Sequence, residues 1–507
     1  MKNHTIPIIL PSKFACGIIL RWLIPTIRLV RLQRGVWMIF NELFVAGKAM
    51  GITMSKTIAA IATGNSVSGI GVIRISGDCA IEIAQKVFKS ADNTPLSSLK
   101  GYTAKFGNVY SKGEKFDNAI ALVFRAPKSY TGEDVVELSV HGGIFIVEKT
   151  LEAVLDAGAS PAEAGEFTKR AFLNGKMDLT QAEAVATLIS ANGQEAAKAS
   201  FNLLQGSLSN KISNVLDKIV SLSASMAAWV DYPDEEIPEL DEKTLKNTLF
   251  FAKNELKELL DNYESGMIMT QGVNTVIAGR PNAGKSTLMN MLSGKEKSIV
   301  THIEGTTRDI VENSVRLGSL VLHLSDTAGL RESDDVVEAI GIKKALERID
   351  TASLVLAVFD SSRELDDDDK MLIDACKGKK AVAVINKTDL SPKIDTDKIK
   401  NNFESIVYIS AKNNLGLKEL ETAVKNILGV EEFDSSAPLI ANRRQKQCIQ
   451  MAYENVSEAL SAAEIGLTYD AINVMIDSAV DELLALTGKK ATEEVVNNIF
   501  SRFCVGK

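Results

Sequence analysis

The chain has 507 residues, of which 45% are hydrophobic and 24% charged, and its formal net charge is -8. This length predicts about three domains with separate cores, and the composition is not that of a disordered or membrane-embedded chain. The negative charge excludes a uniformly basic nucleic-acid-binding protein, so RNA contact needs a local basic cluster or a partner. Five cysteines form no C-x-x-C pair, which argues against disulfides or a zinc cluster and favours a reducing, cytoplasmic compartment.

Residues 1–53 form an atypical N-terminal extension. They contain seven Lys or Arg residues, a single acid (Glu42) and two of the three tryptophans. Their apolar runs are broken by arginines and Pro25, so none reaches the roughly 18 residues of a spanning helix, and no stable membrane association is expected. Three interpretations stay open: a mitochondrial transit peptide, an interfacial helix, or translation that starts at Met54. We favour the last.

Residues 54–173 are predicted to form an α+β domain. Helical stretches near 79–90 and 144–157 alternate with short β runs, which lie at 57–63, 71–76, 118–124 and 135–140.

Two stretches with helical spacing, 174–270 and 430–507, flank a region of different character at 271–429. In that region, strands that are apolar on both faces alternate with helix-length segments, which is typical of a mainly parallel sheet covered on two sides. The strands are predicted at 275–278, 321–325, 354–359, 381–385 and 406–409. We therefore predict a multidomain α/β protein in which an α/β domain is inserted into a discontinuous all-α domain.

Residues 279–286 (GRPNAGKS) match the phosphate-binding loop G-x-x-x-x-G-K-[ST] and lie between a predicted strand and a predicted helix. Backbone N–H groups of such a loop surround the phosphates, Lys285 reaches the β and γ oxygens, and Ser286 offers its hydroxyl to Mg²⁺. A glycine turn without a ligand is the weaker interpretation in this context.

Three further segments strengthen the prediction of a nucleotide site, and the last two of them indicate guanine. Residues 326–329 (DTAG) place a carboxylate and a flexible glycine beside the γ-phosphate and its metal. In residues 386–389 (NKTD), Asp389 accepts two hydrogen bonds that guanine donates and adenine lacks. Residues 410–412 (SAK) close the base pocket. The predicted GTP-binding residues are Asn282, Ala283, Gly284, Lys285, Ser286, Thr287, Thr301, Thr306, Thr307, Asp326, Thr327, Ala328, Gly329, Asn386, Lys387, Asp389, Ser410, Ala411 and Lys412.

Leu330 directly follows the DTAG segment. Ras-like enzymes have a water-orienting glutamine there, and an apolar side chain cannot polarise water, so another group must do so. The P-loop Asn282 and the segments 301–309 (THIEGTTRD), 326–332 (DTAGLRE) and 503–507 (FCVGK) resemble the MnmE (TrmE) family of tRNA-modification GTPases. The resemblance covers 57–507.

The resemblance implies a K⁺ ion held by Asn282, Thr301, Ile303 and Thr306, where other enzymes insert an arginine finger. It also implies Thr307 beside Ser286 on Mg²⁺, with Glu338 and Lys285 as catalytic residues. Glu338 would position water through a second water. Without the resemblance, Glu338 is better interpreted as an exposed helix residue.

The first domain resembles folate-binding aminomethyltransferases. This implies a site for a one-carbon tetrahydrofolate derivative at Arg74, Glu137, Lys176 and Lys507, since cations and a carboxylate suit a pterin with a glutamate tail. Taken alone, Arg74 and Glu137 are typical exposed strand residues. Cys504 is interpreted either as a thiol of this site or as a small buried hydrophobe.

The resemblance also implies a homodimer through the first domains, and a heterotetramer with the FAD-dependent MnmG subunit. Together they would install an aminomethyl or carboxymethylaminomethyl group on C5 of the wobble uridine (position 34) of certain tRNAs. The alternatives are a ribosome-assembly GTPase, for which no KH-type appendage follows residue 428, and a membrane-associated signalling GTPase, which rests only on 1–53.

Overall fold

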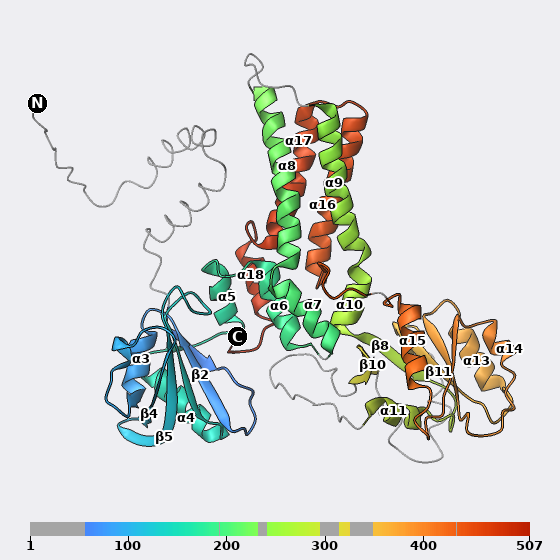
Figure 1. The fold of residues 1–507 in the computed structure, drawn as a ribbon, viewed down its shortest axis with the longest axis horizontal. Helices are drawn as coiled ribbons and strands as arrows, with labels where there is room; N and C mark the ends of the chain where they lie inside the picture. Colours follow the sequence, from blue (N-terminus) through green and yellow to red (C-terminus); the bar gives the residue numbers. More distant parts are fainter. Residues whose placement is uncertain are drawn as a thin grey trace, which may run out of the picture.

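A computed structural model describes residues 56–191, 193–231, 241–294, 314–324, 348–431 and 433–506. The predicted extension 1–53 lies outside the described residues. Figure 1 shows an N-terminal domain built on a sheet, an upright helical bundle, and an α/β domain beside the foot of the bundle. In the part of the chain that is described, no helix is long and apolar enough to cross a membrane.

The N-terminal domain contains a seven-stranded sheet in the order β3-β4-β5-β6-β2-β1-β7. All its strand pairs are antiparallel except β1 with β7. The helices α3 and α4 pack on one face and enclose an apolar core. The elements are β1 (Ile58–Ile61), β2 (Ile70–Ser76), α3 (Ala80–Val87), β3 (Phe88–Ser90), β4 (Thr103–Ser111), β5 (Glu114–Phe124), β6 (Val135–His141), α4 (Ile144–Asp156), β7 (Ser160–Pro161) and α5 (Glu166–Leu173).

One predicted helix was too long. The stretch near 79–90 is helical only to Val87, because Phe88–Ser90 forms β3 and pairs with β4 at Val109, Asn108 and Gly107. Edge pairing with β4 overrides the local helical pattern, as tertiary contacts often do.

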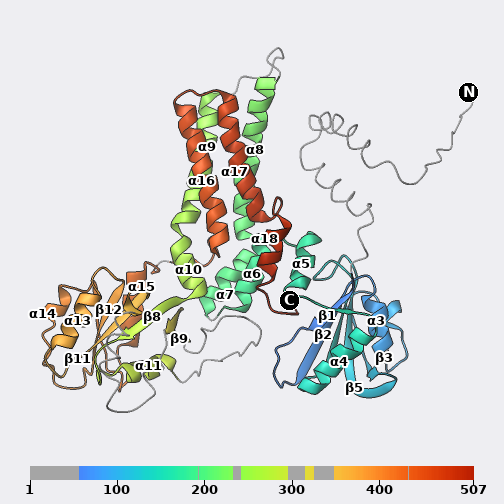
Figure 2. The same cartoon turned by 180° about the vertical axis from the view of Figure 1, so that it is seen from behind.

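The helical domain is built from two stretches that lie on either side of the α/β domain in the sequence. Its core joins residues of both stretches, from Ala184 to Leu259 and from Leu439 to Leu486, in one cluster. Figures 1 and 2 show α8, α9, α16 and α17 side by side along the bundle. The helices are α6 (Leu179–Ile189), α7 (Gln194–Leu204), α8 (Ser207–Asp231), α9 (Glu242–Asp261), α10 (Tyr263–Gln271), α16 (Arg443–Glu464), α17 (Tyr469–Thr487) and α18 (Glu493–Phe500). The predicted discontinuous helical fold is confirmed.

A buried ion pair joins the two stretches. Glu183 of α6 is 7% exposed and accepts two hydrogen bonds of 2.8 Å from Arg444 of α16. The guanidinium also donates to the carbonyls of Ala485 and Leu486 at the end of α17. Gln445 donates a further hydrogen bond of 2.6 Å to the same carboxylate.

We expect Glu183→Ala to lower the free energy of unfolding of the helical domain by about 3 kcal/mol, because it leaves Arg444 buried without its counter-charge. Urea unfolding followed by circular dichroism measures this loss. Lys257→Ala is the matched control, since Lys257 and Asp261 on α9 pair at the surface, with both side chains more than half exposed, and such pairs contribute less than ~1 kcal/mol. Equal losses in the two variants would contradict the expected role of the buried pair.

The α/β domain has a six-stranded sheet in the order β13-β12-β11-β8-β10-β9. All pairs are parallel except β9 with β10. Two apolar clusters lie on its two faces, as predicted for a covered parallel sheet. The elements are β8 (Val273–Ala278), α11 (Lys285–Ser293), β9 (Ser314–Leu317), β10 (Leu320–Leu324), β11 (Leu354–Asp360), α13 (Asp367–Ala375), β12 (Ala381–Asn386), α14 (Asp397–Lys400), β13 (Ser405–Tyr408) and α15 (Leu417–Leu428).

Candidate functional site

The loop between β8 and α11 turns through two residues with left-handed backbone. Asn282 has φ 59° and Gly284 has φ 95°. A Cβ atom on Gly284 would lie 2.1 Å from Nδ2 of Asn386, so only glycine fits this position. The described residues provide no side-chain cap for α11, which starts at Lys285. Its first N–H groups therefore remain available to an anion.

Lys285 folds back over this loop. Its Nζ donates a hydrogen bond of 2.8 Å to the carbonyl of Arg280. Burial lowers the pKa of the Lys285 ammonium. A phosphate oxygen is a stronger partner for an ammonium than a neutral carbonyl, so a bound phosphate would compete for this side chain. Ser286 and Thr287, in the same first turn, are exposed.

A buried asparagine joins this loop to the two loops at the ends of β12 and β13. Asn386 donates through Nδ2 to the carbonyl of Ala283 at 3.0 Å and accepts through Oδ1 from the N–H of Ala411 at 3.0 Å. Asp389 lies three residues further on and accepts a hydrogen bond of 2.6 Å from the hydroxyl of Ser410. This hydrogen bond lowers the pKa of the Asp389 carboxyl, which stays ionised at neutral pH. The predicted phosphate and base segments thus meet at one edge of the sheet.

On the N-terminal domain, the structure brings Arg74 and Glu137 together on neighbouring strands. They are direct register partners of β2 and β6, and Nε of Arg74 lies 2.8 Å from Oε1 of Glu137. The guanidinium also lies 5.6 Å from the ring centres of Tyr130 and Phe167. Lys176 is exposed and donates instead to the carbonyl of Pro127 at 3.0 Å.

The C-terminal segment reaches the same place from the other end of the chain. Val505 forms an isolated antiparallel bridge with Ala164, and the carbonyl of Gly506 accepts a hydrogen bond of 3.3 Å from Nη1 of Arg74. A Cβ atom on Gly506 would lie 2.2 Å from the carbonyl oxygen of Ile61, so the backbone packs closely on β1. Lys507 itself lies outside the described residues.

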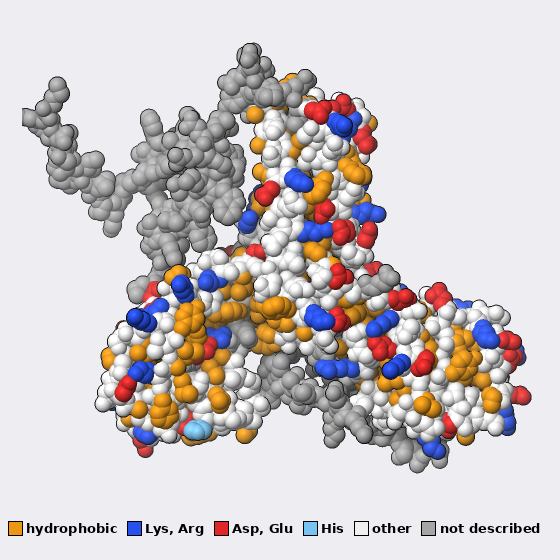
Figure 3. Space-filling model, in the orientation of Figure 1, with side chains coloured by type: hydrophobic (Ala, Val, Ile, Leu, Met, Phe, Trp, Pro, Cys, Tyr) orange, Lys and Arg blue, Asp and Glu red, His pale blue; other side chains and the backbone are white. Residues whose placement is uncertain are grey.

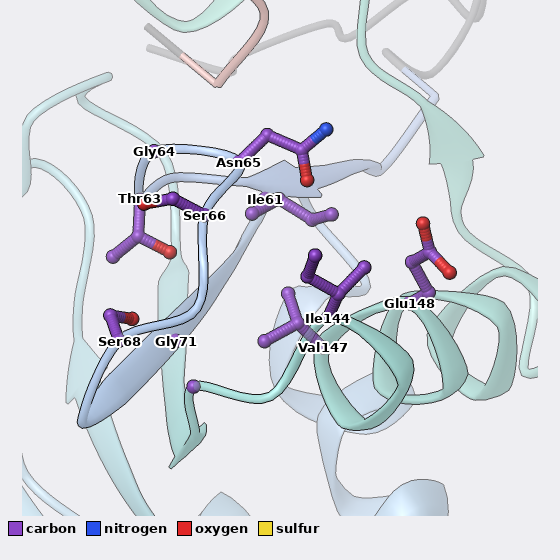
Figure 4. A pocket seen from close by; sticks show the side chains of 11 residues that line it. Ile61, Thr63, Gly64, Asn65, Ser66, Ser68, Gly71, Ile144, Val147 and Glu148 are labelled. Carbon is purple, nitrogen blue, oxygen red and sulfur yellow. The ribbon is translucent and has the colours of Figure 1, made fainter. Parts of the chain in front are cut away.

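A small hollow opens beside β1, where the chain after Ile61 bends toward the start of α4 (Figure 4). Thr63, Asn65 and Ser66 line one side, and Val147 and the other helix residues line the opposite side. A second hollow lies between β7 and α5. Neither hollow is lined by the three predicted folate residues that the structure describes.

Comparison with known proteins decides the family. The protein-family model for the GTP-binding protein TrmE N-terminus matches residues 57–176, and the protein-family model for the MnmE helical domain matches residues 179–504. The tRNA modification GTPase MnmE of Clostridioides difficile (strain 630) is 39% identical over 457 residues, which cover 90% of this chain and 100% of that protein. The MnmE of Carboxydothermus hydrogenoformans is 40% identical over 460 residues, with coverage of 90% and 100%. The chain belongs to the MnmE family.

This MnmE-family chain is accordingly a GTPase of tRNA modification. Among solved structures, the G domain of the T. maritima FeoB iron transporter matches with 26% identity and a TM-score of 0.23, covering 31% of this chain and 98% of that one. A single-residue variant of Aquifex aeolicus Era, bound to GDP.AlF4-, matches with 22% identity and a TM-score of 0.22, covering 36% and 66%.

Several predicted site residues lie outside the described residues: Thr301, Ile303, Thr306, Thr307, Asp326, Thr327, Ala328, Gly329 and Glu338. Conversely, sequence reasoning missed Asp360, which ends β11 and accepts a hydrogen bond of 2.6 Å from Nζ of Lys387. Burial opposes ionisation of Asp360, but hydrogen bonds from Lys387 and Ser362 outweigh it and lower the pKa of this carboxyl. Its position directly after an apolar strand was the available signal.

Proposed function

We propose that the chain binds and hydrolyses GTP at the edge of the six-stranded sheet, and that this drives modification of C5 of the wobble uridine in certain tRNAs. The observation that carries the proposal is Asn386, whose amide joins the phosphate loop at Ala283 to the base loop at Ala411. A ligand that spans both loops has a triphosphate at one end and a purine at the other. We assign Lys285 to the phosphates and Asp389 to guanine.

Two residues of the site that the structure describes, Ser286 and Asn282, suit the binding of two cations. The exposed Ser286 hydroxyl lies in the first turn of α11, which fits Mg²⁺ together with Thr307. Asn282 is exposed and fits K⁺ together with Thr301, Ile303 and Thr306. Bound cations neutralise the negative charge of the phosphates during hydrolysis. Glu338 is assigned to water positioning. For the residues outside the described part of the chain, these assignments rest on the family resemblance.

The one-carbon donor is assigned to Arg74, Glu137, Lys176 and Lys507. Arg74 supports this because strand pairing with Glu137, two aromatic rings and the Gly506 carbonyl fix its guanidinium. A fixed cation beside a carboxylate suits the carboxylate and amide edges of a folate.

Exposed apolar residues on the sheet of the N-terminal domain support a homodimer through these domains. Phe106 and Ile120 are cross-strand partners on β4 and β5 and are 59% and 48% exposed, and Tyr102 and Ile70 are exposed at 66% and 61%. Figure 3 shows apolar side chains gathered over this domain. Exposed apolar area of this kind marks an interaction site. We propose that this cytoplasmic dimer works with an FAD-dependent partner, MnmG, on tRNA.

Reconstitution tests the proposal. The chain, the FAD-dependent partner, undermodified tRNA, GTP and a one-carbon tetrahydrofolate should yield modified wobble uridine, detected by mass spectrometry of nucleosides. Because Arg74 makes charged hydrogen bonds, Arg74→Ala should raise the folate concentration for half-maximal modification roughly ten-fold or more.

Lys115→Ala, an exposed change on β5, is the control and should leave the folate requirement unchanged. Modification that proceeds without any folate would exclude the proposed donor. Hydrolysis of GTP without any change of uridine would exclude the proposed tRNA target and leave the GTPase assignment intact.

A further inference from the structure

In the sequence, the hairpin of β9 and β10 lies between the proposed nucleotide-binding residues Thr307 and Asp326. Ser314 is the first described residue after 295–313, and Leu324 is the last before 325–347. These two stretches contain the proposed nucleotide-binding residues Thr307 and Asp326. The open end of the hairpin, where Ser314 pairs with His323, is therefore connected by the chain to both stretches.

The ring of His323 joins this end of the hairpin to the helical domain. Nδ1 lies 2.8 Å from the hydroxyl of Ser314, and Nε2 lies 2.7 Å from the carbonyl oxygen of Gln271. A carbonyl only accepts, so the Nε2–H group donates. Gln271 is the last residue of α10, directly before the chain enters the α/β domain.

The backbone beside this contact has no room for a side chain. Gly272 has φ 80°, and a Cβ atom there would lie 2.7 Å from Nε2 of His323 and 2.7 Å from the carbonyl oxygen of Val321. The other end of the hairpin also lies against a helix, because a Cβ atom on Gly193 at the start of α7 would lie 3.3 Å from the Ser319 carbonyl oxygen. Figures 1 and 2 show α7 and α10 next to β8 and the hairpin.

A series of hydrogen bonds leads from Gln271 to the buried ion pair of Glu183 and Arg444 in the helical domain. Nε2 of Gln271 donates to the Ala441 carbonyl at 3.2 Å, and the N–H of Ala441 donates to Oε1 of Gln445 at 2.8 Å. Gln445 donates in turn to Glu183, the buried partner of Arg444. This series links the entry and the exit of the α/β domain to α6 and α16.

We propose that His323 is a positioning residue that makes the helical domain respond to the nucleotide. It holds β10 to Gln271 beside the start of β8, the strand that ends at the phosphate loop, so that a change at this loop on nucleotide binding reaches the Gln271–Ala441–Gln445–Glu183 series. The inference rests on the proposed nucleotide site. It requires no contact between His323 and the nucleotide, and therefore predicts loss of communication with little loss of GTP binding.

Hydrogen exchange of the full-length protein tests this. In the wild type, amides of 263–272 and 437–448 should exchange at different rates with GDP and with a non-hydrolysable GTP analogue. In His323→Ala, these differences should disappear, whereas the protection of α11 by nucleotide remains. The KM for GTP should stay within about two-fold, and tRNA modification should fall by about 5- to 150-fold, the usual range for coupling between sites.

Two substitutions separate the two hydrogen bonds of the ring. Glutamine places an amide nitrogen near the position of Nε2, so His323→Gln should keep the nucleotide-dependent exchange difference. Asparagine reaches only the position of Nδ1, so His323→Asn should lose it. His141→Ala is the matched control, because that ring bonds to Asp117 within the N-terminal domain and should change nothing in the nucleotide response.

If His323→Ala keeps the nucleotide-dependent exchange differences at 263–272 and 437–448, the inference is overturned. Loss of GTP binding in this variant would also overturn it, because His323 would then be needed for the nucleotide site itself. If His323→Ala does not fold, equal behaviour of the glutamine and asparagine variants overturns it. A wild type that shows the exchange difference but modifies no tRNA would count against the proposed function alone, because the exchange measurement needs no tRNA.

Discussion

Asp389→Ala is expected to remove the preference for guanine over adenine nucleotides, which should be about 10⁴-fold in the wild type. The carboxylate is exposed, ionised and oriented by the Ser410 hydroxyl at 2.6 Å, so it is set to accept from the two N–H donors of guanine. Adenine has no such donor pair, and its binding would leave the carboxylate unpaired. Titration of fluorescent GDP and ADP measures the ratio of the two dissociation constants.

Asp389→Asn provides a sharper version of the same test. The amide offers a donor where the carboxylate only accepts, so it should favour xanthine nucleotides, which carry a carbonyl in place of the guanine amine. Asp395→Asn is the control, since that exposed carboxylate pairs with Lys398 elsewhere in the domain. Binding of ATP as tight as GTP in the wild type, or retained GTP binding after Lys285 and Asp389 are both changed to alanine, would contradict the proposed site.

Much of the architecture could be predicted because its signals are local and periodic. Strands β8, β10, β11, β12 and β13 are mostly apolar, and each begins and ends within two residues of its predicted range. The insertion of one domain into another followed from the return of the helical pattern, and the shared core of the two helical stretches bears it out. The phosphate loop could be predicted because its glycines, Lys285 and Ser286 have a fixed spacing within one contiguous segment, 279–286.

Strand β4 was missed because two residues interrupt a pattern that otherwise favours a strand. It contains Gly107 and Asn108, both rare in strands. The structure explains the glycine: a Cβ atom there would lie 2.2 Å from the Lys89 carbonyl oxygen on β3. The reason for this residue lies in a neighbour on another strand, well separated in the sequence, so a local pattern could not reveal it.

The polar contacts between distant segments could not be predicted from the sequence either. His323 is a single polar residue in an apolar strand, and nothing in its vicinity indicates Gln271 as its partner. Glu183 resembles a surface residue of an amphipathic helix until Arg444, 261 positions away, is placed beside it. Such contacts depend on how whole elements pack, whereas the phosphate and base motifs are contiguous segments whose chemistry is evident from the residues themselves.

Exchange of K⁺ for Na⁺ at constant ionic strength is expected to slow GTP hydrolysis about 10³-fold, the lower end of the effect of a positive charge placed beside the transferred phosphate. In the MnmE resemblance, K⁺ stands where other enzymes insert an arginine finger, and such a charge stabilises the transition state. Asn282 lies exposed in the phosphate loop with φ 59°, a conformation that asparagine and glycine adopt readily. Phosphate release in KCl and in NaCl measures the difference.

Two variants of Asn282 separate the contribution of its side-chain oxygen to K⁺ stimulation from the contribution of its backbone conformation. Asn282→Gly keeps the left-handed backbone and removes the oxygen, so it should lose most of the acceleration by K⁺ and retain GDP binding. Asn282→Asp keeps an oxygen at the same position and should retain K⁺ stimulation. Equal rates in KCl and NaCl for the wild type would remove the cation mechanism. A glycine variant that K⁺ still accelerates fully would remove Asn282 from the cation site, because the remaining proposed ligands would then suffice without it.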